Sequence, residues 1–318
     1  MKTTLRSHWA NELEEFLQFR QTNFTSSWPR QKIQLFDRFA AQHPKLSLPE
    51  AIAAWLKRDP SRNPRTIGHD LTAVRQFCLY RRRFDPSGSV PFLVGPAPSA
   101  RTYFKATILS IDQVGLLLKR IVHLQGPPLR RARVRALFLV LYCTGLRLGE
   151  AIRLNLADVD LSHAYFRIGP SKGRARWVPF GQDLARELKA WLDQRRRAGF
   201  ILTPQTPLFQ REDGQRDSQW NASMRLNTLF RRCGLKHKRG LGRGGLRVHD
   251  LRHTFAVHRL QRWYSEGLDP SQLLPWLSAY LGHINLLGTQ RYLHATPETL
   301  AMASGRFRRS LNFDPSRP

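Results

Sequence analysis

His249-Asp-Leu-Arg252-His-Thr-Phe-Ala opens the last third of a chain of 318 residues. If a helix covers residues 248–263, His249 and Arg252 share one face because they are three positions apart. Cys-Thr-Gly-Leu-Arg147-Leu-Gly-Glu150 supplies a second arginine upstream. A guanidinium group stays charged at any relevant pH and can bind two phosphate oxygens at once. Arg147 and Arg252 are therefore candidates for stabilising a phosphodiester under attack. An ordinary salt bridge to Glu150 is the alternative for Arg147.

Two further side chains provide groups that such chemistry needs. Tyr292 follows Leu-Gly-His283 by nine residues. A phenol with a pKa of about 10 becomes a nucleophile only among positive charges and a base, which Arg291 and the histidines would supply. Lys172 lies in a predicted hairpin turn, from which an ammonium group can donate a proton to a leaving oxygen. A packing tyrosine and a solvated turn lysine are the ordinary alternatives.

Metal and nucleotide sites are the competing interpretations. His249 and His253 are four residues apart, but the Glu of a His-Glu-x-x-His motif and a nearby acidic third ligand are missing. Gly240-Leu-Gly-Arg-Gly-Gly245 matches G-x-G-x-x-G, but a basic segment precedes it where a nucleotide site has an apolar strand. We therefore expect no metal and no cofactor, and we expect this glycine-rich loop to bind DNA.

The charge balance indicates a polyanionic partner, because 52 Lys and Arg against 23 Asp and Glu leave a net charge of +29. Residues 1–95 hold 15 basic and 8 acidic side chains, and the remainder holds 37 and 15, so both parts are expected to face nucleic acid. A basic solvated surface without such a partner is the alternative. The side chains expected to contact DNA are Arg81, Arg82, Arg83, Arg174, Arg176, Lys236, Lys238, Arg239, Arg243 and Arg247.

The three cysteines, Cys78, Cys143 and Cys233, lack the pair spacing of a zinc site or a disulfide framework, which favours a reducing cytoplasm. The N-terminal residues lack the apolar core of a signal peptide. No run of about 18 uncharged apolar residues is present to span a bilayer. The expected location is cytoplasmic, with no membrane partner.

Periodicity and composition divide the chain. Apolar residues recur at helical spacing from residue 9 to about residue 83, whereas residues 85–106 contain prolines, glycines and serines that exclude a continuous helix. We expect a helical DNA-binding domain over residues 1–84, a linker over 85–106, a larger domain over 107–294 and a C-terminal tail over 295–318.

Within the larger domain, Ser110 and Gln113 have the spacing of a capping box. A buried helix is expected from Arg131 to Tyr142, ended by Gly145. Over residues 164–180 the spacing of apolar residues is no longer helical, which indicates two strands around a turn. The predicted fold class is therefore mainly α with a small β-sheet (α+β), beside an all-α N-terminal domain.

Six residues in this order resemble the catalytic set of the tyrosine recombinases, the integrase family of DNA strand exchangers: Arg147, Lys172, His249, Arg252, His283 and Tyr292. The surrounding motifs are similar to that family's local patterns, and Lys-Gly-Arg-Ala-Arg-Trp-Val-Pro is similar to its hairpin. The resemblance covers about residues 107–300. The N-terminal part resembles the family's core-binding domain in size and character only.

The resemblance implies that Tyr292 attacks a scissile phosphate, leaving a 3′-phosphotyrosyl link and a free 5′-hydroxyl. Arg147, Arg252 and His283 would stabilise the transition state. His249 would manage the tyrosine proton, and Lys172 would protonate the departing oxygen. No metal or nucleotide is needed.

The family acts as four protomers on two DNA duplexes, so the resemblance implies a homo-tetramer on specific recombination sites, with related recombinases as further partners. Residues 295–318 would pass between neighbours or fold back on their own domain. The long interval between Arg252 and His283 favours a transposon-borne subgroup. A type IB topoisomerase and a DNA-binding accessory protein that no longer cuts are the alternatives, and the intact catalytic set argues against the second.

Overall fold

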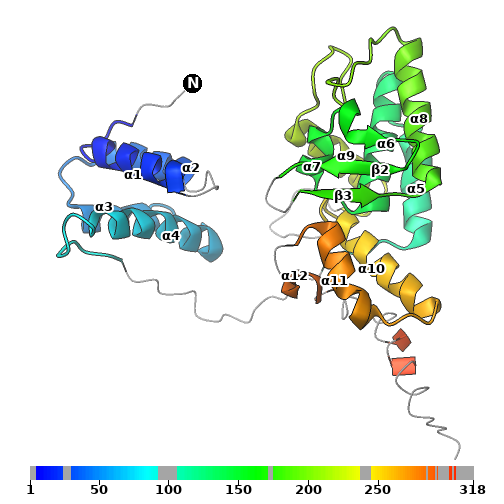
Figure 1. Cartoon of the computed structure of the whole chain (residues 1–318). Helices are drawn as coiled ribbons and strands as arrows, with labels where there is room; N and C mark the ends of the chain where they lie inside the picture. Colours follow the sequence, from blue (N-terminus) through cyan, green and yellow to red (C-terminus); the bar gives the residue numbers. More distant parts are fainter. Residues whose placement is uncertain are drawn as a thin grey trace, which may run out of the picture. The chain divides into compact units, whose positions relative to one another are not determined.

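The computed structural model describes residues 5–23, 30–91, 106–170, 175–236, 245–283, 286–290, 292, 301–302 and 304–305. The chain divides into two compact units, residues 1–103 and residues 104–318 (Figure 1). Several expected features lie outside the described residues: Lys172, Arg174, Lys238, Arg239, Arg243, most of the predicted linker and almost all of the predicted tail. None of the helices in the described parts has the length and apolar character that crossing a membrane requires.

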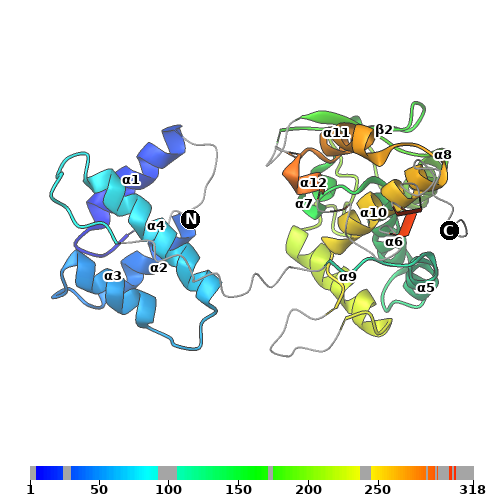
Figure 2. The ribbon, with the colours of Figure 1, turned by 90° about the horizontal axis from the view of Figure 1, so that it is seen from below.

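The first unit consists of helices packed on an apolar core that includes Phe36 and Trp55 (Figure 2). The helices are α1 (Ala10–Asn23), α2 (Arg30–Ala41), α3 (Leu48–Lys57) and α4 (Pro64–Arg81). Inside this unit the buried Asp70 forms ion pairs with three cations, which are Lys32, Arg58 and Arg62. One carboxylate therefore draws together basic side chains from α2 and from the connection between α3 and α4.

The second unit surrounds a larger core with helices and one small sheet (Figure 1). Its helices are α5 (Ile111–Ile121), α6 (Pro128–Thr144), α7 (Leu148–Arg153), α8 (Gln182–Arg197), α9 (Gln219–Arg232), α10 (Asp250–Ser265), α11 (Pro270–Leu281) and α12 (Leu287–Gln290), with a 3-10 turn at Leu156–Asp158. The strands β1 (Val159–Asp160), β2 (Tyr165–Ile168) and β3 (Arg176–Pro179) pair antiparallel in that order. The predicted fold class is confirmed.

Local signals in the sequence account for several boundaries. The Ser110 hydroxyl accepts a hydrogen bond from the Gln113 backbone, and the Gln113 side chain accepts one from the Ser110 backbone, as expected for a capping box. Gly145 ends α6 in the left-handed region, at φ +62°. A Cβ there would lie 2.6 Å from the Phe255 ring, so glycine is required both by the backbone and by close packing.

Two details differ from the expectation. Helix α10 begins at Asp250, so His249 is its N-cap residue and does not lie within the helix. Strand β1 was not expected, because two residues are too few to show an alternating pattern.

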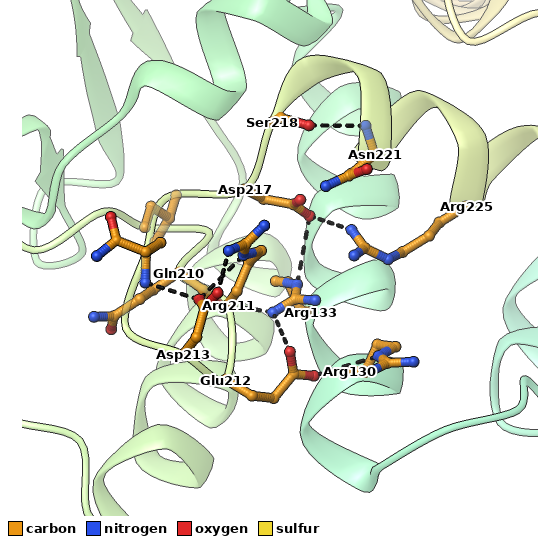
Figure 3. A network of polar contacts seen from close by, with 12 residues as sticks. Arg130, Arg133, Gln210, Arg211, Glu212, Asp213, Asp217, Ser218, Asn221 and Arg225 are labelled. Atoms are coloured by element: carbon orange, nitrogen blue, oxygen red, sulfur yellow. Dashed lines mark hydrogen bonds and ion pairs between the residues drawn. The ribbon is translucent and has the colours of Figure 1, made fainter.

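Ionic contacts fix the segment before α9 against α6 (Figure 3). The buried Arg133 of α6 lies 3.2 Å from a Glu212 oxygen and 3.6 Å from an Asp217 oxygen, and Arg225 of α9 also binds Asp217. Ser218 then caps α9 by accepting a hydrogen bond from the Asn221 backbone. These contacts set the position of α9, which lines the cavity described below.

Candidate active site

The C-terminal end of α11 holds three arginines from distant parts of the second unit. The last carbonyl groups of a helix have no partner within the helix and attract cations. Here three consecutive carbonyl oxygens accept hydrogen bonds: Tyr280 from Arg176 at 2.7 Å, Leu281 from Arg252 at 2.7 Å, and Gly282 from Arg147 at 3.3 Å. The helix end therefore assembles a cationic cluster.

Gly282, the glycine of Leu-Gly-His283, permits this arrangement. It ends α11 at φ +67°, in the left-handed region that favours glycine. A Cβ at this position would lie 2.7 Å from Nη1 of Arg176. The guanidinium group therefore occupies the space that any other residue would fill.

The carboxylate of Glu150 balances part of the positive charge. Its oxygens accept from Nη1 of Arg147 at 2.9 Å and from Nη2 of Arg176 at 3.0 Å. Burial acts to raise the pKa of Glu150, but hydrogen bonds and charge from Arg176, followed by Arg147, hold it at about 2. The salt bridge considered as the alternative for Arg147 is thus present, and Arg147 nevertheless also faces the cavity.

Arg176 is 8% exposed at its side chain, since its guanidinium group is committed to Glu150 and to α11. From the sequence, this residue was expected to contact DNA. The geometry instead favours a role in positioning β3 against the cationic cluster.

Arg252 lies at the centre of the site and is 2% exposed. Besides its bond to Leu281, it donates to the carbonyl oxygen of Gly145 at 2.9 Å. Burial, followed by the charge of Arg147, lowers the pKa of Arg252 to about 10, so the group keeps its charge at neutral pH. Arg147 and Arg252 are therefore neighbours, as the sequence predicted for a phosphate-binding pair.

A cavity of about 780 Å³ opens beside this cluster. Its lining includes Arg147, Arg153, Lys236, Arg247 and His249, together with Gln219, Ser223 and Asn227 from one face of α9. The cavity is thus basic along one part and offers uncharged hydrogen-bonding groups along another. Such a surface fits a phosphate backbone next to base edges.

His249 is among the residues that line the cavity. Loss of water around the ring, and then the charges of Arg252 and Arg247, lower its pKa below the ordinary value of 6.5. The imidazole is therefore neutral at physiological pH and able to accept a proton.

Tyr292 lies in a turn just after α12 and is 3% exposed. Its hydroxyl is 3.1 Å from Nδ1 of His253, and its ring stacks near His283 at a centroid distance of 6.3 Å. His283 in turn bonds through Nδ1 to the Thr289 hydroxyl at 2.7 Å. The negative charge of an ionised Tyr292 would raise the pKa of Arg252, which places the phenol close to the cationic cluster.

The structure thus brings together five of the six predicted catalytic residues, and Lys172 lies outside the described residues. From the sequence, His249 was expected to lie beside the Tyr292 hydroxyl. In the structure, the histidine in contact with that hydroxyl is His253. Only the metal alternative had drawn attention to His253. Among the described residues, no group of three potential metal ligands occurs.

The other expected DNA contacts divide between the units. Lys236 and Arg247 line the cavity, where Arg247 also pairs with Asp250 at 2.6 Å. In the first unit Arg81 pairs with Glu12, Arg82 donates to a backbone carbonyl at 3.2 Å, and Arg83 lies over the Phe19 ring. DNA contact by these side chains stays a prediction.

Comparison with known proteins gives a consistent result. The model of the Phage integrase family matches residues 112–299. A putative integrase/recombinase, y4rB of Sinorhizobium fredii, is 33% identical over 268 residues, which cover 82% of this chain and 83% of that protein. Tyrosine recombinase XerC of Chromobacterium violaceum is 34% identical over 230 residues, covering 72% and 69% respectively.

Two solved structures have a similar fold. The XerH site-specific recombinase, bound to a palindromic difH substrate, has a TM-score of 0.65 at 18% identity and covers 95% of this chain and 90% of its own. The Tn1549 transposon integrase, in complex with transposon right end DNA, has a TM-score of 0.65 at 16% identity and covers 94% and 98%.

Proposed function

This chain belongs to the phage integrase family of tyrosine recombinases, which are DNA strand-transferring enzymes, and from that premise we propose how its own residues carry out site-specific recombination. The Tyr292 oxygen attacks a scissile phosphorus and forms a 3′-phosphotyrosyl bond, while the bond to the 5′ oxygen breaks and that oxygen leaves as a hydroxyl. A 5′-hydroxyl of the partner strand then reverses the step and releases the tyrosine. The energy of the broken bond is kept in the covalent link.

The observation that carries this mechanism is the anchoring of Arg147 and Arg252 on adjacent carbonyl groups beside a basic cavity. Fixed guanidinium groups stabilise the charge of the transition state without reorganising. The neutral His249 is suited to accept the tyrosine proton, and His283 adds a donor to a phosphate oxygen. Lys172 is proposed from the sequence as the proton donor to the leaving oxygen.

We assign the DNA backbone to the basic side of the cavity and base edges to the exposed face of α9. The assembly that we propose is four copies on two duplexes with specific sites, acting in the cytoplasm, with residues 295–318 linking neighbours and related recombinases as further partners. A type IB topoisomerase and a non-cutting accessory protein are not favoured by the comparisons.

Capture of covalent complexes tests the proposal. Purified protein is mixed with fragmented, nicked genomic DNA of the source cell, and denaturant-resistant complexes are isolated, sequenced and digested with trypsin. The DNA-bearing peptide should contain Tyr292, and Tyr292→Phe should give no complex. Tyr165→Phe, on strand β2, serves as the matched control and should behave like wild type. A DNA-bearing peptide from elsewhere in the chain would show that the nucleophile is another residue.

A further inference from the structure

A cationic cluster in the first unit is distinct from the side chains that were expected to contact DNA there. It consists of Lys32 in the first turn of α2 and of Arg58 and Arg62 in the connection between α3 and α4. All three pair with the carboxylate of Asp70. Nζ of Lys32 lies 2.8 Å from Oδ1, Nη2 of Arg58 lies 3.0 Å from Oδ2, and Arg62 also contacts Oδ2. These four groups together carry a surplus of positive charge.

The negative charge of this cluster is hidden, and its positive charges reach the surface. The Asp70 side chain is 0% exposed, whereas the side chains of the three cations are 13% to 25% exposed. Burial acts to raise the pKa of Asp70, but hydrogen bonds from Lys32 and then from the two arginines lower it overall, so the carboxylate stays ionised at neutral pH. A ligand that approaches from solvent therefore meets the cations.

The surroundings of the cluster add to the surplus. Residues 57–65 contain four basic residues and one acidic residue, Asp59. The exposed Asp59 accepts hydrogen bonds from the backbone and the hydroxyl of Ser61, at 2.9 and 2.7 Å, and these bonds lower its pKa more than the charges of the nearby arginines do. Helix α4 follows with no acidic residue in its first turn to offset the positive end of its dipole. Each of these features favours a bound anion.

The candidate active site contains the same arrangement of charges. There the buried carboxylate of Glu150 binds Arg147 and Arg176, and Arg147 also lines the cavity. A carboxylate that fixes a cation in advance reduces the side-chain freedom that is lost when a phosphate binds. One counter-charge would be enough to balance Asp70, so three cations at one carboxylate indicate a prepared site and not only a buried ion pair.

We propose that Lys32, Arg58 and Arg62 form a phosphate-binding subsite, which holds a backbone phosphate of duplex DNA on the first unit. The inference rests on the proposed function, because it takes DNA as the partner. Arginine and lysine bind phosphate oxygens through charge-assisted hydrogen bonds. Backbone contacts position a duplex without reading its sequence, so this subsite contributes to affinity for every DNA.

Chemical modification of lysines locates the site on the unaltered protein. The full-length protein is acetylated at low salt with and without a duplex of arbitrary sequence, and the modified lysines are quantified by mass spectrometry. Lys32 should lose reactivity when DNA is present, because the phosphate covers its amino group. Lys45 is exposed and lies beyond the opposite end of α2, so its reactivity should not change.

A matched pair of variants measures the contact. Lys32→Gln removes one cation and leaves Arg58 and Arg62 to balance Asp70. The slope of the logarithm of affinity against the logarithm of salt concentration should fall by about 0.9 in this variant. Between about 50 and 200 mM salt, the wild type should therefore lose roughly threefold to fourfold more affinity than Lys32→Gln does. Lys45→Gln should keep the slope of the wild type.

Either of two results overturns the proposal. One is equal acetylation of Lys32 with and without DNA, which is decisive even if Lys32→Gln does not fold. The other is a folded Lys32→Gln variant with the same slope as Lys45→Gln, which would mean that the cluster only stabilises the first unit. Both assays follow binding and not cleavage, so they stay decisive if Tyr292 is not the nucleophile. A wild type that bound no DNA would refute the proposed function together with this subsite.

Discussion

Replacing Arg176 by methionine should destabilise the second unit more than any change at an exposed arginine. Methionine keeps much of the length and apolar volume of the side chain but removes the guanidinium group. The variant loses the hydrogen bond to the Tyr280 carbonyl and both contacts with Glu150, at 3.3 and 3.0 Å. The Glu150 carboxylate, 1% exposed at its side chain, then stays buried with much of its counter-charge removed.

The expected size of the effect follows from the pKa of Glu150. A shift from 4.5 to about 2 corresponds to roughly 3 kcal/mol of stability at neutral pH. Removing one partner of a buried ion pair costs about 3–5 kcal/mol, which agrees in size. For a unit of this length, each kcal/mol of lost stability lowers the melting temperature by about 2–4 °C. The melting temperature of Arg176→Met should therefore lie roughly 6–12 °C below that of wild type at pH 7.

The pH dependence gives a second, independent check. Because the folded pKa of Glu150 lies below its ordinary value, its contribution is complete above pH 4.5 and is lost as the pH falls toward 2. The difference between wild type and Arg176→Met should therefore be largest at pH 7 and smaller at pH 3.5.

Scanning calorimetry of the intact protein at both pH values measures this difference. Arg186→Met is the control, because Arg186 and its partner Asp183 are both exposed and such pairs contribute little. Two results would contradict the reasoning. One is an Arg176→Met melting temperature equal to that of the Arg186→Met control at pH 7. The other is a difference in melting temperature between wild type and Arg176→Met that is as large at pH 3.5 as at pH 7.

Three other changes test separate parts of the site. Gly282→Ala should lower single-turnover cleavage at least about tenfold with DNA binding retained, because its Cβ would displace Arg176, whereas Gly181→Ala, with open space around it, should have no effect. In a binding selection, Gln219→Ala should relax the preference for particular bases. Arg153→Ala should weaken binding to all sequences, and it should reduce the slope of the logarithm of affinity against the logarithm of salt concentration by about one, which corresponds to one lost phosphate contact. The rate of covalent complex formation should decline only below pH 6.5, as His249 becomes protonated, and His249→Gln should remove that decline from the pH profile.

Local features of the fold could be predicted because their causes lie within a few residues. The capping box at Ser110 and the left-handed glycine at Gly145 follow from short-range hydrogen bonding and backbone geometry. The same holds for the helices, whose apolar periodicity is read within one or two turns. The candidate site was recognisable for a different reason, since its motifs resemble those of a family.

Contacts that join distant segments could not be predicted in this way. Arg176 and Tyr280 are 104 positions apart, and His253 and Tyr292 are 39 positions apart. In so basic a chain, nothing local distinguishes a buried arginine from one that faces solvent. Arg176 was therefore grouped with the expected DNA contacts, and His253 was considered only in the metal alternative, which the missing acidic ligand argued against.

The buried arginines also change how the net charge of +29 is to be understood. Arg133, Arg195 and Arg252 are buried, and each donates to backbone carbonyl groups of distant segments, so part of the positive charge serves to hold the second unit together. Salt screens exposed charges strongly and buried ones weakly. Rising ionic strength should therefore dissociate DNA from the basic side chains of the cavity, because their charges are exposed. The arginine cluster at the end of α11 should stay intact under the same conditions, because its charges are buried.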